Sequence, residues 1–102
     1  MRQLLVIILG LLPVVLYSQF VTGKIIDADS KIPLEYVNIG VIGKDKGTVC
    51  DKAGVFSLEL PERFDNDTLR ISIVGYDPVL YSVWEFKKLY QKSLDGLIIE
   101  LT

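Results

Sequence analysis

Histidine is absent from the 102-residue sequence, and cysteine and tryptophan occur only once each. Without histidine the chain has neither Ser-His-Asp nor Cys-His catalysis and no His-ligated metal site. The single cysteine, Cys50, forms no internal disulfide and no cysteine-based zinc cluster, and we expect it to be buried in a strand as a small hydrophobe. A basic nucleic-acid footprint is also missing, because 11 Lys and Arg face 13 Asp and Glu. These absences point away from an enzyme, and we expect a small module with no cofactor and no metal.

Hydrophobic residues are concentrated at the N-terminus, where residues 4–16 carry no charge and follow one basic residue, Arg2. A basic start, a short apolar core and a polar end at residues 17–19 are typical of a secretory signal peptide. A spanning helix needs roughly 20 apolar residues, and Pro13 disfavours a long continuous helix. We therefore predict a signal peptide over residues 1–19 and an exported domain over residues 20–102. An uncleaved membrane anchor is the alternative.

After residue 20 the sequence is organised as short alternating segments separated by turn residues. The alternation predicts strands over residues 20–27, 34–42, 48–50, 55–60, 68–74, 79–83 and 97–101. Residues 83–93 favour a short helix instead, with Phe86, Leu89 and Tyr90 as its apolar stripe. Seven short strands spaced by about ten residues indicate an all-β fold, a seven-stranded antiparallel β-sandwich with a short helix before the last strand.

The clearest turn signal is Asp51-Lys52-Ala53-Gly54, directly before the strand over residues 55–60. An aspartate that begins a four-residue turn accepts hydrogen bonds from the backbone two residues on, and a glycine supplies positive φ. In the strand that follows, Phe56, Leu58 and Leu60 form the expected core face.

Several short motifs follow one another along the chain in a recognisable order. They are Gly23-Lys24-Ile25 with Asp27, Pro33-Leu34 before Val37-Asn38-Ile39, Gly47-Thr48 before Cys50-Asp51, Asp51-x-x-Gly54-x-Phe56, and Ile73-x-Gly75-Tyr76. The pattern resembles the carboxypeptidase-regulatory-like domain, which has a transthyretin-like Greek-key β-sandwich fold. One departure is Cys50, because a threonine often stands at this position. The resemblance implies structural roles for the motif residues Gly23, Pro33, Asp51, Gly54, Phe56, Gly75 and Tyr76.

The resemblance also implies a setting and a function. Similar domains follow the signal peptide of TonB-dependent outer-membrane receptors and other envelope proteins of gram-negative bacteria, and they are not themselves catalytic. We therefore expect an accessory module in the periplasm, the outer membrane or at the cell surface that binds a protein partner of the envelope. Both a free-standing module and the N-terminal domain of an outer-membrane receptor-type system fit this expectation.

Two ligand hypotheses stand beside this interpretation. The pairs Asp27 with Asp29 and Asp65 with Asp67 offer oxygen ligands for calcium, but they lack the spacing of a calcium loop and lie where turn residues belong. Aromatic residues are also crowded into the last third of the chain, and an exposed aromatic platform stacks on sugar rings. A carbohydrate-binding module is therefore the alternative function, with Tyr81, Trp84 and Tyr90 as its contact residues, unless these side chains only pack the helix onto the sandwich.

Overall fold

The computed structural model describes residues 20–102, so the signal peptide predicted for residues 1–19 lies outside the described residues. The strands are β1 (Phe20–Asp27), β2 (Asn38–Val41), β3 (Gly47–Val49), β4 (Val55–Glu59), β5 (Thr68–Ser72), β6 (Val79–Ser82) and β7 (Leu97–Leu101). The helices are the 3-10 turn η2 (Glu62–Phe64) and α2 (Val83–Lys92). Within residues 20–102, no helix is both long enough and apolar enough to cross a membrane.

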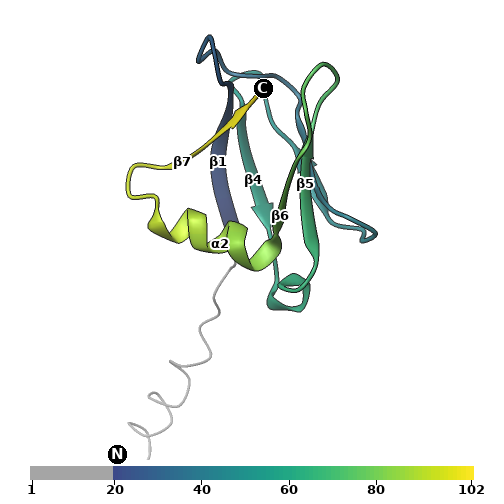
Figure 1. Ribbon diagram of the computed structural model, residues 1–102. Coiled ribbons are helices and arrows are strands. Elements are labelled where there is room, and N and C mark those ends of the chain that lie inside the picture. The colour runs from purple at the N-terminus through teal and green to yellow at the C-terminus, as the bar shows by residue number, and fades with distance from the viewer. Residues whose placement is uncertain (1–19) are drawn as a thin grey trace, which may run out of the picture.

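The seven strands form two sheets that face each other, with strand orders β4-β1-β7 and β3-β2-β5-β6 (Figure 1). The helix α2 lies across one end of the sandwich and carries the chain from β6 in one sheet to β7 in the other (Figure 1). The prediction of a β-sandwich with a short helix before the last strand is therefore confirmed.

The prediction of a wholly antiparallel sandwich is wrong at one pair of strands. β7 runs parallel to β1, in the register Gly23 opposite Leu97 to Asp27 opposite Leu101. The physical reason is that β1 and β7 do not follow each other in the chain, so no tight hairpin forces them to be antiparallel. The segment that contains α2 crosses from β6 in the other sheet and brings β7 into its sheet in the same direction as β1.

Alternate residues of both sheets fill the space between them. On β4 the buried residues are Phe56 and Leu58, and Leu60 follows them, as the alternation predicts. The Phe86 ring enters this core from α2, with its centroid 6.2 Å from that of Phe56 and 5.4 Å from that of Tyr81. The other fully buried core residues include Ile25, Val37, Ile39, Leu69, Ile71, Val83 and Leu101.

Two predicted strands are shorter in the structure than expected. The strand predicted over residues 34–42 is limited to β2, because Tyr36 has φ +57° and interrupts the extended chain. The strand predicted over residues 68–74 ends at Ser72, and Val74 is 96% exposed in the turn that Gly75 completes with φ +94°.

The helix α2 begins at a capped end and presents a different apolar face from the one predicted. The Ser82 hydroxyl accepts a hydrogen bond from the Glu85 N–H, which satisfies one of the unpaired donors of the first turn. Val83 and Phe86 are buried and Tyr90 packs against the core, whereas Leu89 is 38% exposed. The assignment of Leu89 to the apolar stripe is therefore wrong, because at 100° per residue it lies about 90° from the middle of the buried face.

Candidate functional site

The Asp51–Gly54 turn is built by hydrogen bonds and by a close approach of two backbones. The Asp51 Oδ1 atom accepts from the N–H groups of Ala53 and Val55, both at 2.9 Å. Gly54 has φ +79°, and a Cβ atom on it would lie 2.5 Å from the Ile25 carbonyl oxygen. The turn therefore presses directly on the middle of β1, which only glycine allows.

Other motif residues meet at the same strand. A Cβ atom on Gly23 would lie 2.9 Å from the Phe56 ring, so the missing side chain makes room for that ring. Pro33 forms an isolated bridge with Ile26, and its Cβ atom would lie 3.3 Å from a Cβ atom on Gly54. Cys50 is buried, as expected, although it lies just after β3 rather than within it. Its Sγ atom accepts from the Val37 N–H at 3.1 Å.

Gly75 and Tyr76 form a second corner with Asp27. The Tyr76 hydroxyl donates to Asp27 Oδ2 at 2.7 Å, while Oδ1 accepts from the N–H groups of Ser30 and Asp29, both at 2.8 Å. The Ser30 backbone bond is the main cause that lowers the pKa of Asp27 to about 2, followed by the Tyr76 hydroxyl and the Asp29 backbone. The bond to Asp27 in turn raises the pKa of Tyr76.

One carboxylate of each acidic pair considered as a calcium ligand has other partners here. Both oxygens of Asp27 are used within its turn and by Tyr76, and Asp65 forms an ion pair with Lys87. Among residues 20–102, no group of three or more His, Cys, Asp or Glu side chains could hold a metal ion.

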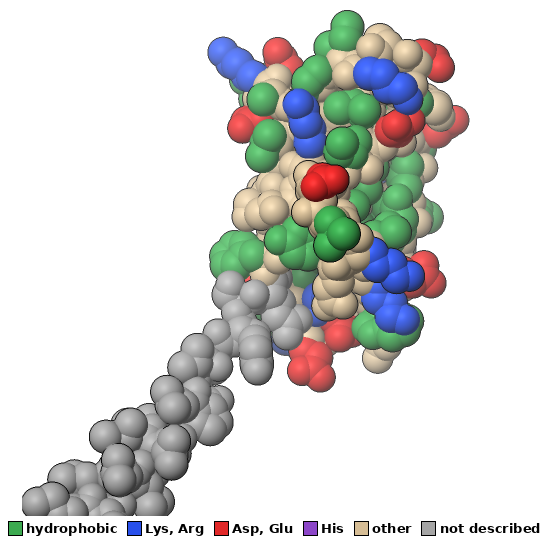
Figure 2. All heavy atoms as spheres, turned by 90° about the vertical axis from the view of Figure 1, so that its left-hand side faces the viewer, with side chains coloured by type: hydrophobic (Ala, Val, Ile, Leu, Met, Phe, Trp, Pro, Cys, Tyr) green, Lys and Arg blue, Asp and Glu red, His purple; other side chains and the backbone are tan. Residues whose placement is uncertain are grey.

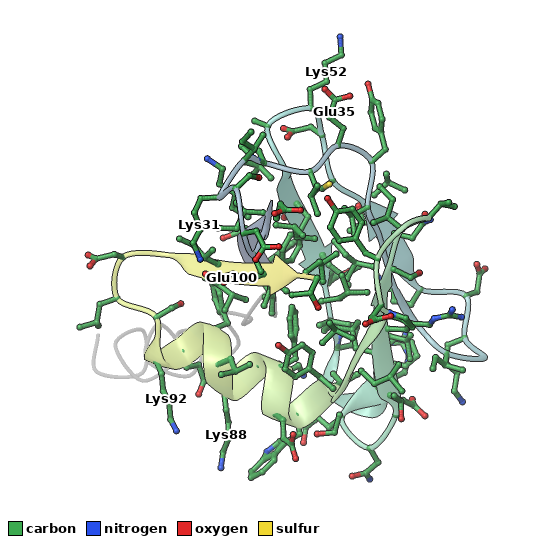
Figure 3. All side chains as sticks on the ribbon, turned by 45° about the horizontal axis from the view of Figure 1, so that its top comes forward. Lys31, Glu35, Lys52, Lys88, Lys92 and Glu100 are labelled. Carbon is green, nitrogen blue, oxygen red and sulfur yellow. The ribbon has the colours of Figure 1, made fainter. Side chains whose placement is uncertain are left out.

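The three aromatic residues considered as ligand contacts have different surroundings. Trp84 is 50% exposed on α2, and Lys88 Nζ lies 3.6 Å from its ring centroid. Lys88 and Lys92 point from α2 away from the sandwich (Figure 3). Tyr81 and Tyr90 instead pack against the core. Tyr81 lies on β6, and of the two residues on α2 only Trp84 therefore belongs to the outer face of the helix.

Each sheet ends in two terminal strands, and within residues 20–102 the outer sides of these strands are not paired with another strand. β3 and β4 nevertheless lie close to each other at one side of the sandwich. On β3 the hydrogen bonds from Cys50 N–H to Val37 O and from Val41 N–H to Lys46 O show which residues face β2. Because antiparallel partners alternate, the main-chain groups of Gly47 and Val49 point away from β2. They point to the side on which β4 approaches β3, where the Asp51 N–H donates to Val55 O. Neither residue carries a charge.

All four terminal strands carry features that discourage pairing. Glu59 on β4 forms an ion pair with Lys46, which directly precedes β3, so this ion pair flanks both strands, and Pro61 after β4 has no N–H to donate. On β7, Glu100 forms an ion pair with Lys31 (Figure 3). On β6, Pro78 precedes the strand and α2 follows it directly.

Around β7 and the end of α2, hydrophobic side chains lie between charged ones over much of the surface (Figure 2).

A shallow open trough beside the β3 edge was not predicted from the sequence. It measures about 370 Å³ and is lined by Asn38, Ile39, Gly40, Gly47, Thr48 and Val49. Gly40 and Gly47 are direct partners in the β2–β3 register, so two adjacent positions on the outer face have no side chain. The signal that could have revealed it is a glycine in the middle of a strand, which often marks a close approach of another group.

These features define a small, two-sheet β module whose motif glycines and aspartates hold β1 against its neighbours. Over residues 21–92 the chain matches the CarboxypepD_reg-like domain, and it belongs to that family. The predicted resemblance is confirmed, and the family is a generally non-catalytic β-sandwich module. A search of curated proteins finds no match to the chain.

Proposed function

We propose that this chain is an exported accessory module of the cell envelope that holds a protein partner by accepting one of the partner's strands at a free sheet edge. The observation that carries the proposal is the presence of terminal strands with outward main-chain groups, in a family that is generally non-catalytic. Main-chain hydrogen bonds at such an edge give affinity, and neighbouring side chains give specificity. The module acts either on its own or as the N-terminal domain of an outer-membrane receptor-type system.

Cross-linking in the cell that produces the protein tests this proposal. A tagged chain is cross-linked in isolated envelopes, and variants carry proline at an outward position of β3, β4 or β7: Val49→Pro, Ser57→Pro or Ile98→Pro. We expect one reproducible partner that is lost with proline on one edge only, because proline removes the N–H that an added strand needs. A partner that survives all three variants would contradict strand addition, and the absence of any partner would contradict the proposal itself.

The half-exposed Trp84 favours carbohydrate binding as a second candidate function. Trp84 is the only tryptophan, so its fluorescence reports on this position alone. Titration with envelope oligosaccharides would shift the emission if sugar rings stack on the indole, and Trp84→Ala would abolish binding. An unchanged spectrum with every oligosaccharide would remove this second function.

A further inference from the structure

We infer that the outer face of the four-stranded sheet β3-β2-β5-β6 binds an acidic sugar, whose carboxylate pairs with Arg70 and whose ring lies in the trough at Gly40. This site goes beyond the proposed function, because it lies on the face of a sheet rather than at its edge and takes a small ligand rather than a strand. The strand register and the burial of neighbouring residues place each side chain on this face.

Arg70 is the only charged residue in the four strands that the structure describes for this sheet. Its neighbours Leu69 and Ile71 are fully buried, so the alternation of β5 places Arg70 on the outer face, where it is exposed. β5 lies between β2 and β6, so this charge does not protect a terminal strand from pairing. Within residues 20–102, no carboxylate forms an ion pair with Arg70. An unpaired cation on an otherwise uncharged face favours an anionic ligand.

The open side of Arg70 is the trough. Arg70 lies opposite Leu80 of β6 on one side and opposite Gly40 of β2 on the other. Leu80 has a large, exposed side chain, whereas Gly40 and its partner on β3, Gly47, have none. Residues directly opposite each other on neighbouring strands are about 5 Å apart, so a ligand in the trough at Gly40 lies within reach of the guanidinium group.

The fold does not require the missing side chain of Gly40. Its φ is not among the positive values of the chain, and a Cβ atom would lie 3.4 Å from the Lys46 carbonyl oxygen, at the limit of ordinary contact. Glycine within a strand weakens it, and it often marks a site where a ligand approaches the backbone closely. The open floor at Gly40 is therefore best explained by a ligand that lies on it.

Two neutral polar side chains, Asn38 and Ser72, lie next to the trough on the same face. They are opposite each other in the β2–β5 register, two residues along from Gly40 and Arg70. Within residues 20–102, neither side chain forms a hydrogen bond. An amide and a hydroxyl group both donate and accept hydrogen bonds, as the hydroxyl groups of a sugar require. Three polar side chains thus surround one position that has no side chain.

Other classes of ligand fit this face less well. β2 and β5 each have a neighbouring strand on both sides, so their main-chain groups are not free to hold an extended peptide. A nucleic acid needs several cations along its phosphates, and this face has one. An acidic sugar needs a single cation for its carboxylate and neutral polar groups for its hydroxyl groups. A planar guanidinium group matches a carboxylate through two parallel hydrogen bonds.

NMR titration of the full chain, in the form that the expressing cell yields, tests the inference. The acidic probes are galacturonate and glucuronate. Their methyl esters keep the ring and the hydroxyl groups without the charge, and acetate carries a carboxylate without the ring. We expect at least one of the acidic sugars to shift the amide signals of Gly40, Gly47 and Arg70. It should bind about three to ten times more tightly than its ester or acetate.

Variants separate the charge from the trough. Arg70→Gln should reduce the affinity for the acidic sugar to that for its ester, and Gly40→Val should abolish binding of both by filling the trough. Lys24→Gln is the matched control, because it removes the same charge from the outer face of the middle strand of the other sheet and should leave binding unchanged. The dispersion of the amide spectrum verifies that each variant is folded, and the exposed position of Arg70 makes Arg70→Gln the variant least dependent on folding.

Each failure overturns a stated part of the inference. Equal affinity for the acidic sugars and their esters, or unchanged binding by Arg70→Gln, would overturn the pairing with Arg70. Equal affinity for acetate, or unchanged binding by Gly40→Val, would overturn the sugar ring in the trough. Shifts centred on Trp84 would move sugar binding to α2, and no binding at millimolar concentration would overturn the site altogether. None of these results affects strand addition at a sheet edge, which the cross-linking experiment tests separately.

Discussion

At the scale of single residues, two glycines with similar φ values allow the cost of a left-handed backbone to be measured separately from the cost of a steric clash. Gly43 and Gly54 have φ values of +74° and +79°, but only Gly54 has atoms within 4 Å of a Cβ position. We expect Gly43→Ala to lower the free energy of unfolding by about 1–2 kcal/mol through the left-handed backbone alone. Gly54→Ala should cost about 1–3 kcal/mol more, because its methyl group would overlap the Ile25 carbonyl. Urea denaturation measures both, and equal losses would contradict the close approach of the turn to β1.

The hydrogen bonds that Asp27 accepts, first from the Ser30 N–H and then from the Tyr76 hydroxyl, make a stability contribution that depends on pH. The pKa of Asp27 is lowered from 3.8 to about 2 in the folded chain, so its contribution is complete above pH about 4 and is lost as the pH falls to about 2. The raised pKa of Tyr76 has the opposite sign, and its contribution is lost as the pH rises through and beyond about 10. Urea denaturation of wild type and Asp27→Asn from pH 2 to 5 checks the acidic limb. A wild-type curve that is no steeper than that of Asp27→Asn would contradict the assignment.

At the scale of one element, α2 is attached to the sandwich mainly through Phe86. The ring is fully buried and contacts both Phe56 and Tyr81, so Phe86→Ala should lower the free energy of unfolding by about 3–5 kcal/mol. Leu89→Ala is the matched control on the same helix, and we expect it to cost less than about 1 kcal/mol because Leu89 is partly exposed. Thermal or urea unfolding compares the two variants. A larger loss for Leu89→Ala would mean that the helix is rotated from the orientation described.

At the scale of elements, some features of the fold can be predicted from the sequence and others cannot. The strands, the core face of Phe56 and Leu58, and the Asp51–Gly54 turn follow from local signals, namely alternation, turn chemistry and the demand for positive φ. The parallel pairing of β7 and the exposure of Leu89 depend on contacts between distant segments, which alternation within one segment does not encode. The trough also depends on contacts between distant segments, because Gly40 and Gly47 become neighbours only in the register in which β2 and β3 pair.

At the scale of the whole molecule, the start of β1 limits where a signal peptide can be removed. β1 is the middle strand of its sheet, and its first residue, Phe20, is already paired with Glu59 of β4. A cut beyond Phe20 would therefore remove strand pairs, whereas a cut after residue 19 leaves every described strand pair in place. We expect the protein recovered from the periplasm, the outer membrane or the cell surface to begin at or just before Phe20.

Intact-mass spectrometry combined with fractionation of a gram-negative host measures both the cut and the location. The exported species should lack about nineteen residues. Ile8→Arg is the control, because a charge within residues 4–16 interrupts the apolar run and should retain the precursor inside the cell without altering residues 20–102. An intact chain in the inner membrane would make residues 4–16 an anchor. The domain would then be tethered to that membrane, and its partner would have to be sought at the membrane surface.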